Sequence, residues 1–281
     1  MKNFFVILLL MFTFGCASVY NTALGKKELI FISSSQEVAL GKLLNAQMKM
    51  QLTTSNDEAL NKRLKKIGNR IALNSDRTDL NYSFNVAEDK ELNAFALPGG
   101  FIYVNSGLME KATDDELACV LAHEIGHVAA KHSVKRLQVS LGYSIVMSLA
   151  FNKAEYVDTI QAMNTVFNYV SLGYSRNDER QADTLAVKYA YKSGFNPEGI
   201  ISFFKKLQEE AEKQNRSQQL VFLSSHPPIN ERIKYTEENI TKINNNQSLF
   251  DCNLKICPKC NKTYPKQYDY CQDDGTKLIC R

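Results

Sequence analysis

Residues 113–129 read TDDELACVLAHEIGHVA, and their pattern predicts a buried helix. Thr113 and Glu116 have the spacing of a capping box, so the helix should begin near Asp114. Apolar side chains recur at helical spacing, and neither proline nor glycine interrupts the segment before Gly126. These apolar positions are Leu117, Val120, Leu121 and Val128.

Two histidines on this predicted helix flank a glutamate. His123 and His127 are four residues apart, which puts both imidazoles on one face, and Glu124 stands between them. The arrangement suits a zinc ion held by two histidines, with the glutamate as a base for a bound water. The alternative is a structural helix with two satisfied core histidines. Burial of an unpaired carboxylate is costly, and this disfavours the alternative.

A catalytic zinc site needs a third protein ligand. The three-histidine pattern requires a histidine at position 133, where the chain has Ser133, and His132 is one residue out of register. Glu179 and Asp183 are better candidates, because they lie one turn apart on a second helix predicted within residues 175–194. One can bind zinc while the other holds a ligand histidine through its free ring nitrogen. Without the zinc motif, the pair would be a solvated acidic edge.

A short sheet is predicted ahead of the first helix. Residues 82–86 alternate between apolar and polar, as in a half-buried strand. Residues 94–97 and 101–104 flank Pro98-Gly99-Gly100, which indicates a turn between two extended segments. A strand beside a zinc cleft can pair its free backbone groups with an extended peptide. The alternative is an ordinary hairpin packed under the helix.

Four motifs occur in order along the chain: Asn93 to Gly100, His123 to His127, Glu179 to Asp183, and Ser225-His226-Pro227-Pro228 followed by Arg232. Taken together, they make the chain resemble the gluzincin-type zinc metallopeptidase family of the CAAX prenyl endopeptidase, HtpX and BepA. The motifs occur in the family's order over roughly residues 35 to 240. The resemblance is to the lipoprotein or periplasmic branch rather than to the integral-membrane members.

The resemblance implies a role for each matching residue. His123, His127 and Glu179 would bind the catalytic zinc, and Glu124 would activate water. Asp183 would support a ligand from behind, and His226 and Arg232 would line the active site. His226 could donate a hydrogen bond to the oxyanion or could sit on the zinc in a resting state. The predicted substrate-binding residues are Asn93, Ala94, Phe95, Ala96, Gly99 and Gly100.

The expected fold is therefore α+β, a mostly helical zincin-like metallopeptidase core with a small β-sheet and a small C-terminal Cys-rich module. At 281 residues with 44% hydrophobic content, the chain can form one full core plus an appendage. The expected organisation is a signal peptide (1–15), a lipid-anchored tether (16–34), the peptidase domain (35–243), a linker (244–250) and a zinc-ribbon-like module (251–281).

The N-terminus predicts export. Lys2 precedes an apolar run from Phe4 to Phe14, which is too short to span a bilayer comfortably. Gly15 and Cys16 resemble a lipoprotein cleavage box, so Cys16 is the predicted lipidation site, with plain secretion or an uncleaved anchor as alternatives. Ala17 is compatible with the outer membrane. The chain would then be lipid-anchored in the bacterial cell envelope, on the periplasmic side.

Composition and the middle of the chain exclude other classes of protein. A net charge of +4 from 34 basic and 30 acidic residues argues against a nucleic-acid partner. Residues 139–151 are mostly apolar but too few for a transmembrane helix, and 156–172 are amphipathic. Both stretches are expected to be core or cleft-covering helices, with a membrane-facing or substrate-gating role as the alternative.

The tail carries five cysteines within thirty residues. Cys257, Cys260 and Cys271 have the spacing of a zinc ribbon, and Asp274 stands where a fourth cysteine is usual. A second, structural zinc is predicted here. Either Asp274 binds it, Cys252 or Cys280 substitutes, or the metal is absent. Disulfides are the competing interpretation in an exported protein.

The sequence thus predicts a zinc-dependent endopeptidase that hydrolyses unfolded or misassembled envelope proteins. The attacking group would be a zinc-activated water, with Glu124 as the general base. The alternative is a chaperone or scaffold that has the same fold and acts mainly by binding envelope proteins.

Overall fold

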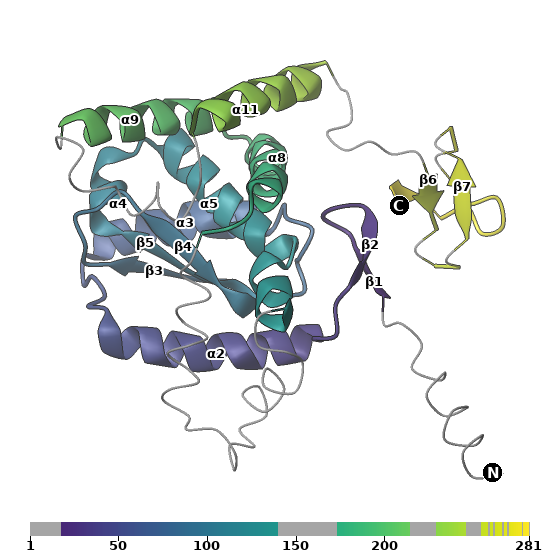
Figure 1. The fold of residues 1–281 in the computed structure, drawn as a ribbon, viewed down its shortest axis with the longest axis horizontal. Helices are drawn as coiled ribbons and strands as arrows, with labels where there is room; N and C mark the ends of the chain where they lie inside the picture. Colours follow the sequence, from purple (N-terminus) through teal and green to yellow (C-terminus); the bar gives the residue numbers. More distant parts are fainter. Residues whose placement is uncertain are drawn as a thin grey trace, which may run out of the picture.

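The computed structural model describes residues 18–139, 173–213 and 229–245, and 254–280 apart from 258, 261, 266, 269 and 277. The predicted lipidation site Cys16, the active-site candidate His226 and the predicted helices at 139–151 (apart from Val139) and 156–172 lie outside these residues. Within them the expected α+β class is confirmed. Figure 1 shows α9 and α11 on one side of the molecule and α2 on the opposite side, with the sheet and α5 between them.

The central helix is α5, Asp114–Ala129, and its predicted start is confirmed. The side chain of Thr113 accepts a hydrogen bond from the Glu116 amide, and that of Glu116 accepts one from the Thr113 amide, which completes the capping box. Four helices pack around α5 or over its neighbours. They are α3 (Glu58–Ala72), α8 (Arg176–Lys192), α9 (Gly199–Lys213) and α11 (Ile229–Asn244).

Helices α5 and α8 approach each other closely at Gly126. A Cβ atom added to Gly126 would lie 3.1 Å from the carbonyl oxygen of Ala182 and 3.1 Å from Cβ of Leu185. A larger residue would therefore push the two helices apart. Helix α8 begins after Ser175, within the range 175–194 predicted for it, and the Ser175 side chain forms a second capping box with Asp178. Because α5 and α8 are so close at Gly126, side chains within one turn of Gly126 on α5 can contact side chains of α8.

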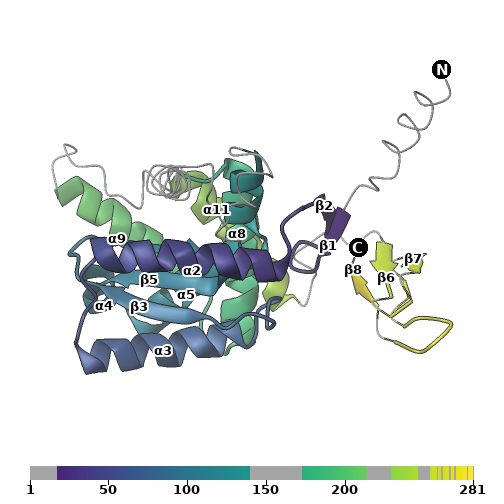
Figure 2. The same cartoon turned by 90° about the horizontal axis from the view of Figure 1, so that it is seen from below.

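The sheet has the strand order β3-β5-β4. Strand β3 (Ser83–Ala87) is parallel to β5 (Phe101–Asn105), and β4 (Ala94–Leu97) is antiparallel to β5, so β4 is an edge strand. The predicted turn at Pro98–Gly100 is present, with φ of 76° at Gly99 and 89° at Gly100. These left-handed values favour glycine. Helix α3 covers one face of the sheet (Figure 2), and α4 (Ser106–Lys111) follows β5.

A buried carboxylate on α2 (Ser34–Gln51) joins three other parts of the core. Oε2 of Glu37 lies 3.2 Å from Nη1 of Arg77 and 3.3 Å from Nζ of Lys131. Its Oε1 accepts a hydrogen bond of 3.4 Å from the backbone amide of Gly99. Glu37 therefore links the turn after the edge strand to the chain that leaves α5.

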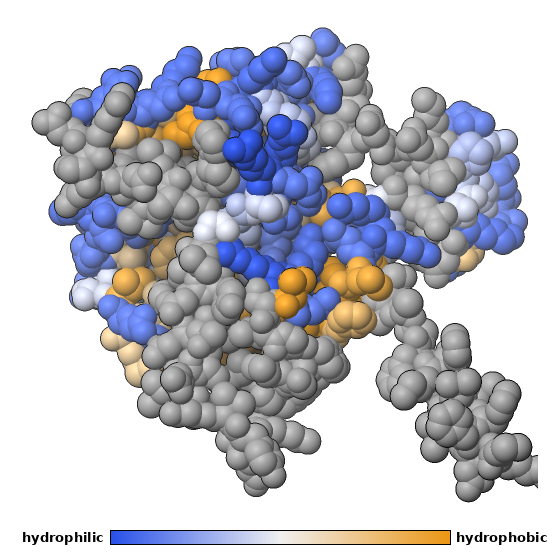
Figure 3. Space-filling model, viewed as in Figure 1, coloured by the Kyte–Doolittle hydropathy of each residue, from blue (hydrophilic) through white to orange (hydrophobic). Residues whose placement is uncertain are grey.

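A hairpin of β1 (Ser18–Asn21) and β2 (Lys26–Leu29) precedes α2. It falls inside the segment expected to be a tether, yet several side chains here are buried against the peptidase core. These are Ala23, Leu24, Ile30 and Ile32. Other apolar side chains of this region, Val19, Leu29 and Phe31, are exposed, and hydrophobic residues reach the surface around the hairpin in Figure 3.

The tail forms a separate three-stranded sheet. Its order is β7-β6-β8, from Thr263–Pro265, Leu254–Ile256 and Ile279–Cys280, and all pairings are antiparallel. Among the described residues, no helix is long and apolar enough to cross a membrane.

Candidate metal centre

Three side chains from α5 and α8 converge in the interior. Nε2 of His123 and Nε2 of His127 are 3.0 Å apart, and the Glu179 carboxylate oxygens lie 3.6 Å and 3.5 Å from them. All three side chains are buried. Ligand atoms around one tetrahedral zinc at about 2.0–2.1 Å would lie about 3.3 Å from one another. The donor set and its spacing therefore fit a zinc ion, and these are the residues that could hold it.

Behind this cluster, Asp183 and Arg232 hold His123. Nδ1 of His123 lies 2.9 Å from Oδ1 of Asp183. The guanidinium of Arg232, from α11, donates to both Asp183 oxygens at 2.9 and 2.7 Å. Burial alone would raise the pKa of the Asp183 carboxyl, but the Arg232 charge and the His123 hydrogen bond hold it well below its usual range. Asp183 is therefore ionised and keeps the second His123 nitrogen, Nε2, directed at the cluster.

Arg232 also lies against the third member of the cluster. Its Nη1 is 3.1 Å from Oε2 of Glu179. Arg232 is buried, and the neighbouring carboxylates raise its pKa in spite of that burial. One guanidinium thus orients both Glu179 and Asp183 of α8. Its contacts are those of a residue that positions the cluster.

Glu124 is buried beside the cluster, and its surroundings shift the pKa of its carboxyl group. Burial and the nearby Glu179 carboxylate raise its pKa well above the ordinary value, while Arg232 and a hydrogen bond from the Ala96 backbone lower it less strongly. Ala96 belongs to β4, so the carboxylate touches the edge strand of the sheet. A carboxyl group with a raised pKa can both accept and return a proton near neutral pH.

His132 supports His127, a contact that the ligand count along the sequence did not reveal. Nδ1 of His132 is 2.9 Å from Nδ1 of His127, and its Nε2 is 3.1 Å from Oε1 of Gln181. A metal on Nε2 of His127 would leave the His127 proton on Nδ1. Nδ1 of His132 then accepts a hydrogen bond from His127, and Nε2 of His132 donates one to Gln181. Burial lowers the pKa of His132 to about 4, so its ring is neutral, as this chain of hydrogen bonds requires.

The backbone at Lys131 makes the contact between the two histidines possible. Lys131 has φ of 57°, the only left-handed value for a non-glycine residue among those described. It ends α5, and residues 132–139 then form a new helix. No sequence pattern predicts a left-handed conformation at a lysine. The hint that the sequence offered was His132, which lies one residue from the position where the three-histidine pattern requires a ligand. The ring of Tyr174 covers the other face of His127, with 3.9 Å between ring centroids.

The predicted substrate-binding residues lie on and around β4. Ala94 and Ala96 are buried, and Phe95 stacks on Tyr103 of β5 with 5.2 Å between ring centroids. Asn93 precedes the strand, and its side chain accepts a hydrogen bond from the Ala94 amide. Gly99 and Gly100 pack closely in the turn, where added Cβ atoms would lie 2.9 Å from Val38 and 3.0 Å from Tyr82. Packing therefore accounts for both glycines.

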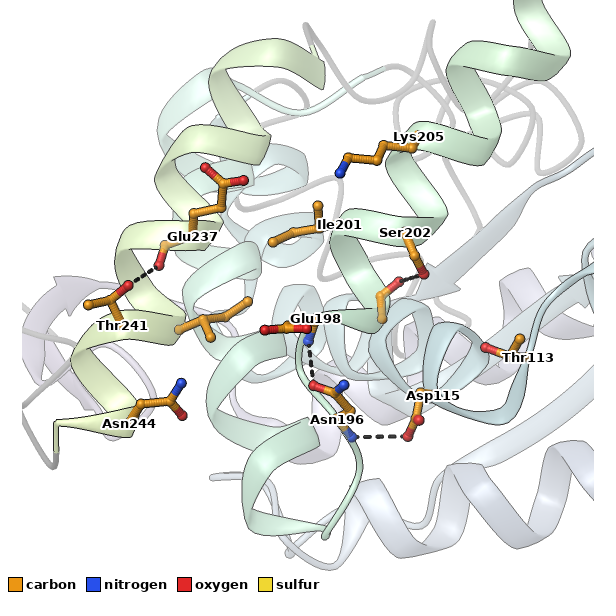
Figure 4. A pocket seen from close by; sticks show the side chains of 12 residues that line it. Thr113, Asp115, Asn196, Glu198, Ile201, Ser202, Lys205, Glu237, Thr241 and Asn244 are labelled. Atoms are coloured by element: carbon orange, nitrogen blue, oxygen red, sulfur yellow. Dashed lines mark hydrogen bonds between the residues drawn. The ribbon is translucent and has the colours of Figure 1, made fainter.

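Two further features lie away from this cluster. In the tail, one metal-ligand atom from each of Cys257, Cys260, Cys271 and Asp274 falls within 4.8 Å of the others. Between α9, α11 and the start of α5 lies an open hollow of about 560 Å³ (Figure 4). Polar side chains such as Glu198 and Glu237 line it, and none of the cluster residues does.

The comparisons with known proteins agree with this geometry. Residues 58–240 match Peptidase family M48, and this range contains the whole cluster. The chain is 32% identical over 183 residues to Metalloprotease LoiP of Escherichia coli (strain K12), which covers 64% of this chain and 70% of that protein. It is 26% identical over 218 residues to the putative beta-barrel assembly-enhancing protease of Vibrio cholerae, which covers 74% of this chain and 44% of that protein.

A eukaryotic relative shares the same region. The mitochondrial metalloendopeptidase OMA1 of Schizosaccharomyces pombe is 28% identical over 190 residues, 67% of this chain and 56% of that protein. The chain thus spans less than two thirds of several relatives that it matches. The shared part carries the two helices, the edge strand and the His-His-Glu cluster, and it covers more than half of the chain. On this evidence the chain belongs to Peptidase family M48 and is a metalloendopeptidase.

Proposed function

We propose that this chain is a zinc-dependent endopeptidase of the bacterial cell envelope that cleaves unfolded or misassembled proteins. The observation that carries the proposal is the convergence of His123, His127 and Glu179 beside the buried carboxyl of Glu124. His123, His127 and Glu179 would hold the zinc. When bound, the ion supplies Lewis-acid chemistry, which polarises a peptide carbonyl and acidifies water.

Glu124 would be the general base. Its carboxylate would take a proton from water as the scissile carbonyl is attacked, and would then pass that proton to the leaving amine. The raised pKa supports the base role, because a carboxylate of ordinary pKa is a weaker base and accepts a proton from water less readily near pH 7. The hydrogen bond from the Ala96 backbone keeps the carboxyl group in place between the two transfers.

Strand β4 would align the substrate. It is an edge strand, and Glu124 lies against its Ala96 backbone. An extended peptide added beside such an edge gains affinity from main-chain hydrogen bonds and little side-chain selectivity. Unfolded protein segments offer that extended backbone, whereas folded domains do not. The residues that would meet the peptide are Ala94, Phe95 and Ala96 of the strand and Asn93 just before it.

Two further observations support the proposed cellular location and the proposed class of substrate proteins. Relatives from Vibrio cholerae and Escherichia coli carry the name beta-barrel assembly-enhancing protease, which points to proteins assembled at the envelope. The apolar segment before Cys16 supports export and a lipid anchor on that cysteine. Replacement Cys16→Ala should then move the protein from the membrane fraction to the soluble fraction.

The decisive experiment compares Glu124→Gln with the wild type on an unfolded protein such as reduced casein. The variant should lose cleavage and keep its zinc, because the amide preserves shape and cannot accept the proton. Glu110→Gln is the matched control: Glu110 is an exposed glutamate on α4 paired with Lys90, and its loss should leave turnover unchanged. A chelator should abolish wild-type cleavage, and added zinc should restore it.

The same experiment separates an enzyme from a binding protein. Near-normal turnover by Glu124→Gln would reject the assigned base. Binding of casein by the wild type with no zinc-dependent cleavage would reject the endopeptidase and favour a chaperone that works on the same fold. Cleavage by the wild type together with retained casein binding by Glu124→Gln would support the proposal, since the edge strand is intact in both.

A further inference from the structure

The tail contains two loops of the same shape. In the first, Cys257 and Cys260 are three residues apart, and the amide of Cys257 donates to the carbonyl of Lys262 at 2.9 Å. In the second, Cys271 and Asp274 are three residues apart, and the amide of Cys271 donates to the carbonyl of Thr276 at 2.8 Å. Both hydrogen bonds span five residues. Asp274 therefore occupies in the second loop the position that Cys260 occupies in the first.

The side chains of the two loops meet at distances that suit one metal ion. Sγ of Cys260 lies 3.6 Å from Sγ of Cys271, and Sγ of Cys257 lies 3.6 Å from Oδ2 of Asp274. A tetrahedral zinc with sulfur at about 2.3 Å and oxygen at about 2.0–2.2 Å would hold two sulfurs about 3.8 Å apart and sulfur and oxygen about 3.6 Å apart. A disulfide needs about 2.05 Å. All three cysteines are free thiols.

The tail module has too little apolar core to fold without a crosslink or a metal. Its buried side chains among the described residues are Cys257, Cys271 and Leu278, with Tyr264 packed beside them. Its strands are two or three residues long. Burial of so little apolar surface does not offset the entropy lost on ordering such a segment. Two of the three buried residues are themselves candidate ligands.

We propose that Cys257, Cys260, Cys271 and Asp274 bind one structural zinc ion, with the Asp274 carboxylate as the fourth ligand. Four protein ligands close the coordination shell, which distinguishes this site from a catalytic one. Its role is to fold the tail, and it is independent of peptide cleavage.

Neighbouring groups hold the ligands in place. The amide of Cys260 donates to Sγ of Cys257 at 3.4 Å, and such a hydrogen bond stabilises a thiolate around a metal. The hydroxyl of Tyr264 lies 3.1 Å from Sγ of Cys271 and donates to Oδ2 of Asp273 at 3.1 Å. The amide of Thr276 donates to Oδ1 of Asp274 at 2.9 Å, which leaves Oδ2 for the ion. The adjacent Asp273 is engaged elsewhere, because it pairs with Lys262 at 2.7 Å.

Metal analysis of the full-length chain tests the site. The wild type should hold two zinc ions, and Cys257→Ser/Cys271→Ser should hold one while keeping peptidase activity. Asp274→Ala should release its second zinc at a chelator concentration at least about tenfold lower than the wild type, by the loss of a direct ligand. Asp273→Asn removes a carboxylate of equal charge one residue away and should retain both ions with wild-type affinity.

Cobalt substitution separates the two sites within one protein. Thiolate ligands give a sulfur-to-cobalt charge-transfer absorption, which the His123, His127 and Glu179 cluster has no sulfur to produce. The wild type should show this absorption, and Asp274→Cys should strengthen it, because a fourth thiolate joins the ion. A single zinc per chain with no such absorption would overturn the proposal. So would a native disulfide at Cys257, Cys260 or Cys271, seen by mass spectrometry of the unreduced protein, or an Asp274→Ala variant that binds as tightly as the wild type.

Discussion

Nδ1 of His132 lies 2.9 Å from Nδ1 of His127, and the second His132 nitrogen faces Gln181 at 3.1 Å. The chain of contacts runs from α8 through two imidazoles to the metal-facing atom Nε2 of His127. It fixes which nitrogen of His127 carries the proton, because the amide oxygen of Gln181 can only accept. Asp183 does the same for His123 from the other side.

Replacement His132→Phe should weaken zinc binding on the order of 10- to 100-fold, as is usual when the partner behind a ligand histidine is lost. Phenylalanine keeps an aromatic ring in the buried space but cannot accept the His127 proton. Competition with a chromophoric chelator measures the affinity. His132→Asn offers an amide oxygen as acceptor and should recover part of the loss. Equal affinities for the phenylalanine variant and the wild type would show that the contact does not hold His127.

Glu179→Ala and Asp183→Asn should differ in how much zinc affinity they lose. Glu179 is the proposed third ligand, so its removal should leave the site unable to keep zinc under mild chelation. Asp183→Asn should cost on the order of 10- to 100-fold, because the amide still accepts from His123 without the charge. Zinc content after dialysis against a weak chelator compares the two. Full occupancy in Glu179→Ala would place the third ligand elsewhere.

The sequence predicted those parts of the fold that local patterns specify. The boxes Thr113–Glu116 and Ser175–Asp178 each lie within four residues, and the two helices begin one residue after Thr113 and Ser175, within the ranges predicted for them. The turn at Pro98–Gly100 also follows from local chemistry, since left-handed φ favours glycine. The spacing of His123 and His127 predicted a shared site, the family resemblance implied Glu179 as the third member, and the structure brings the three together.

Contacts that depend on distant segments were not readable in the same way. The parallel pairing of β3 with β5 follows from tertiary packing and not from alternation within either strand. The His127–His132 contact depends on the left-handed Lys131, a conformation that lysine rarely adopts. Glu37 meets Arg77 and Lys131, which are 40 and 94 residues away in the sequence. No period or motif connects positions so far apart.

Because of Glu116, the free energy of unfolding should depend on pH in the acid range. Burial alone would raise its pKa, but hydrogen bonds from Lys206, Thr113 and Ser202 lower it below the ordinary value. A carboxyl whose pKa is lowered by folding stabilises the protein above its unfolded pKa of about 4.3, and this contribution is lost as the pH falls through the folded pKa.

The variant Glu116→Gln isolates that contribution, because glutamine can still complete the capping box with Thr113. The wild type should be more stable than the variant at pH 7, and the difference should shrink below about pH 4.5. Urea unfolding at several pH values measures both curves, and other acid effects are common to the two proteins. Parallel curves down to pH 3 would show that the Lys206–Glu116 pair, 2.6 Å apart, does not stabilise the fold.

Glu37→Gln should destabilise the protein by about 3 kcal/mol, the lower end of the range for breaking a buried ion pair. Glutamine keeps the size of the side chain and can still accept from the Gly99 amide. It leaves the buried guanidinium of Arg77 and the ammonium of Lys131 without their shared carboxylate. The loss of stability should stay near the lower end of that range, because Arg77 keeps its ion pair with Asp79, in which Nε lies 2.9 Å from Oδ1.

Urea unfolding at pH 7 measures the effect, and Glu110→Gln serves as the control. Glu110 pairs with Lys90 at the surface, with both side chains more than half exposed, so its loss should change the unfolding free energy by less than about 0.5 kcal/mol. Because Glu37 joins the turn after β4 to the chain leaving α5, the variant should also raise KM for casein more than it lowers kcat. A change in stability below about 1 kcal/mol would mean that solvent replaces the carboxylate, and that Glu37 does not hold the turn after β4 against the end of α5.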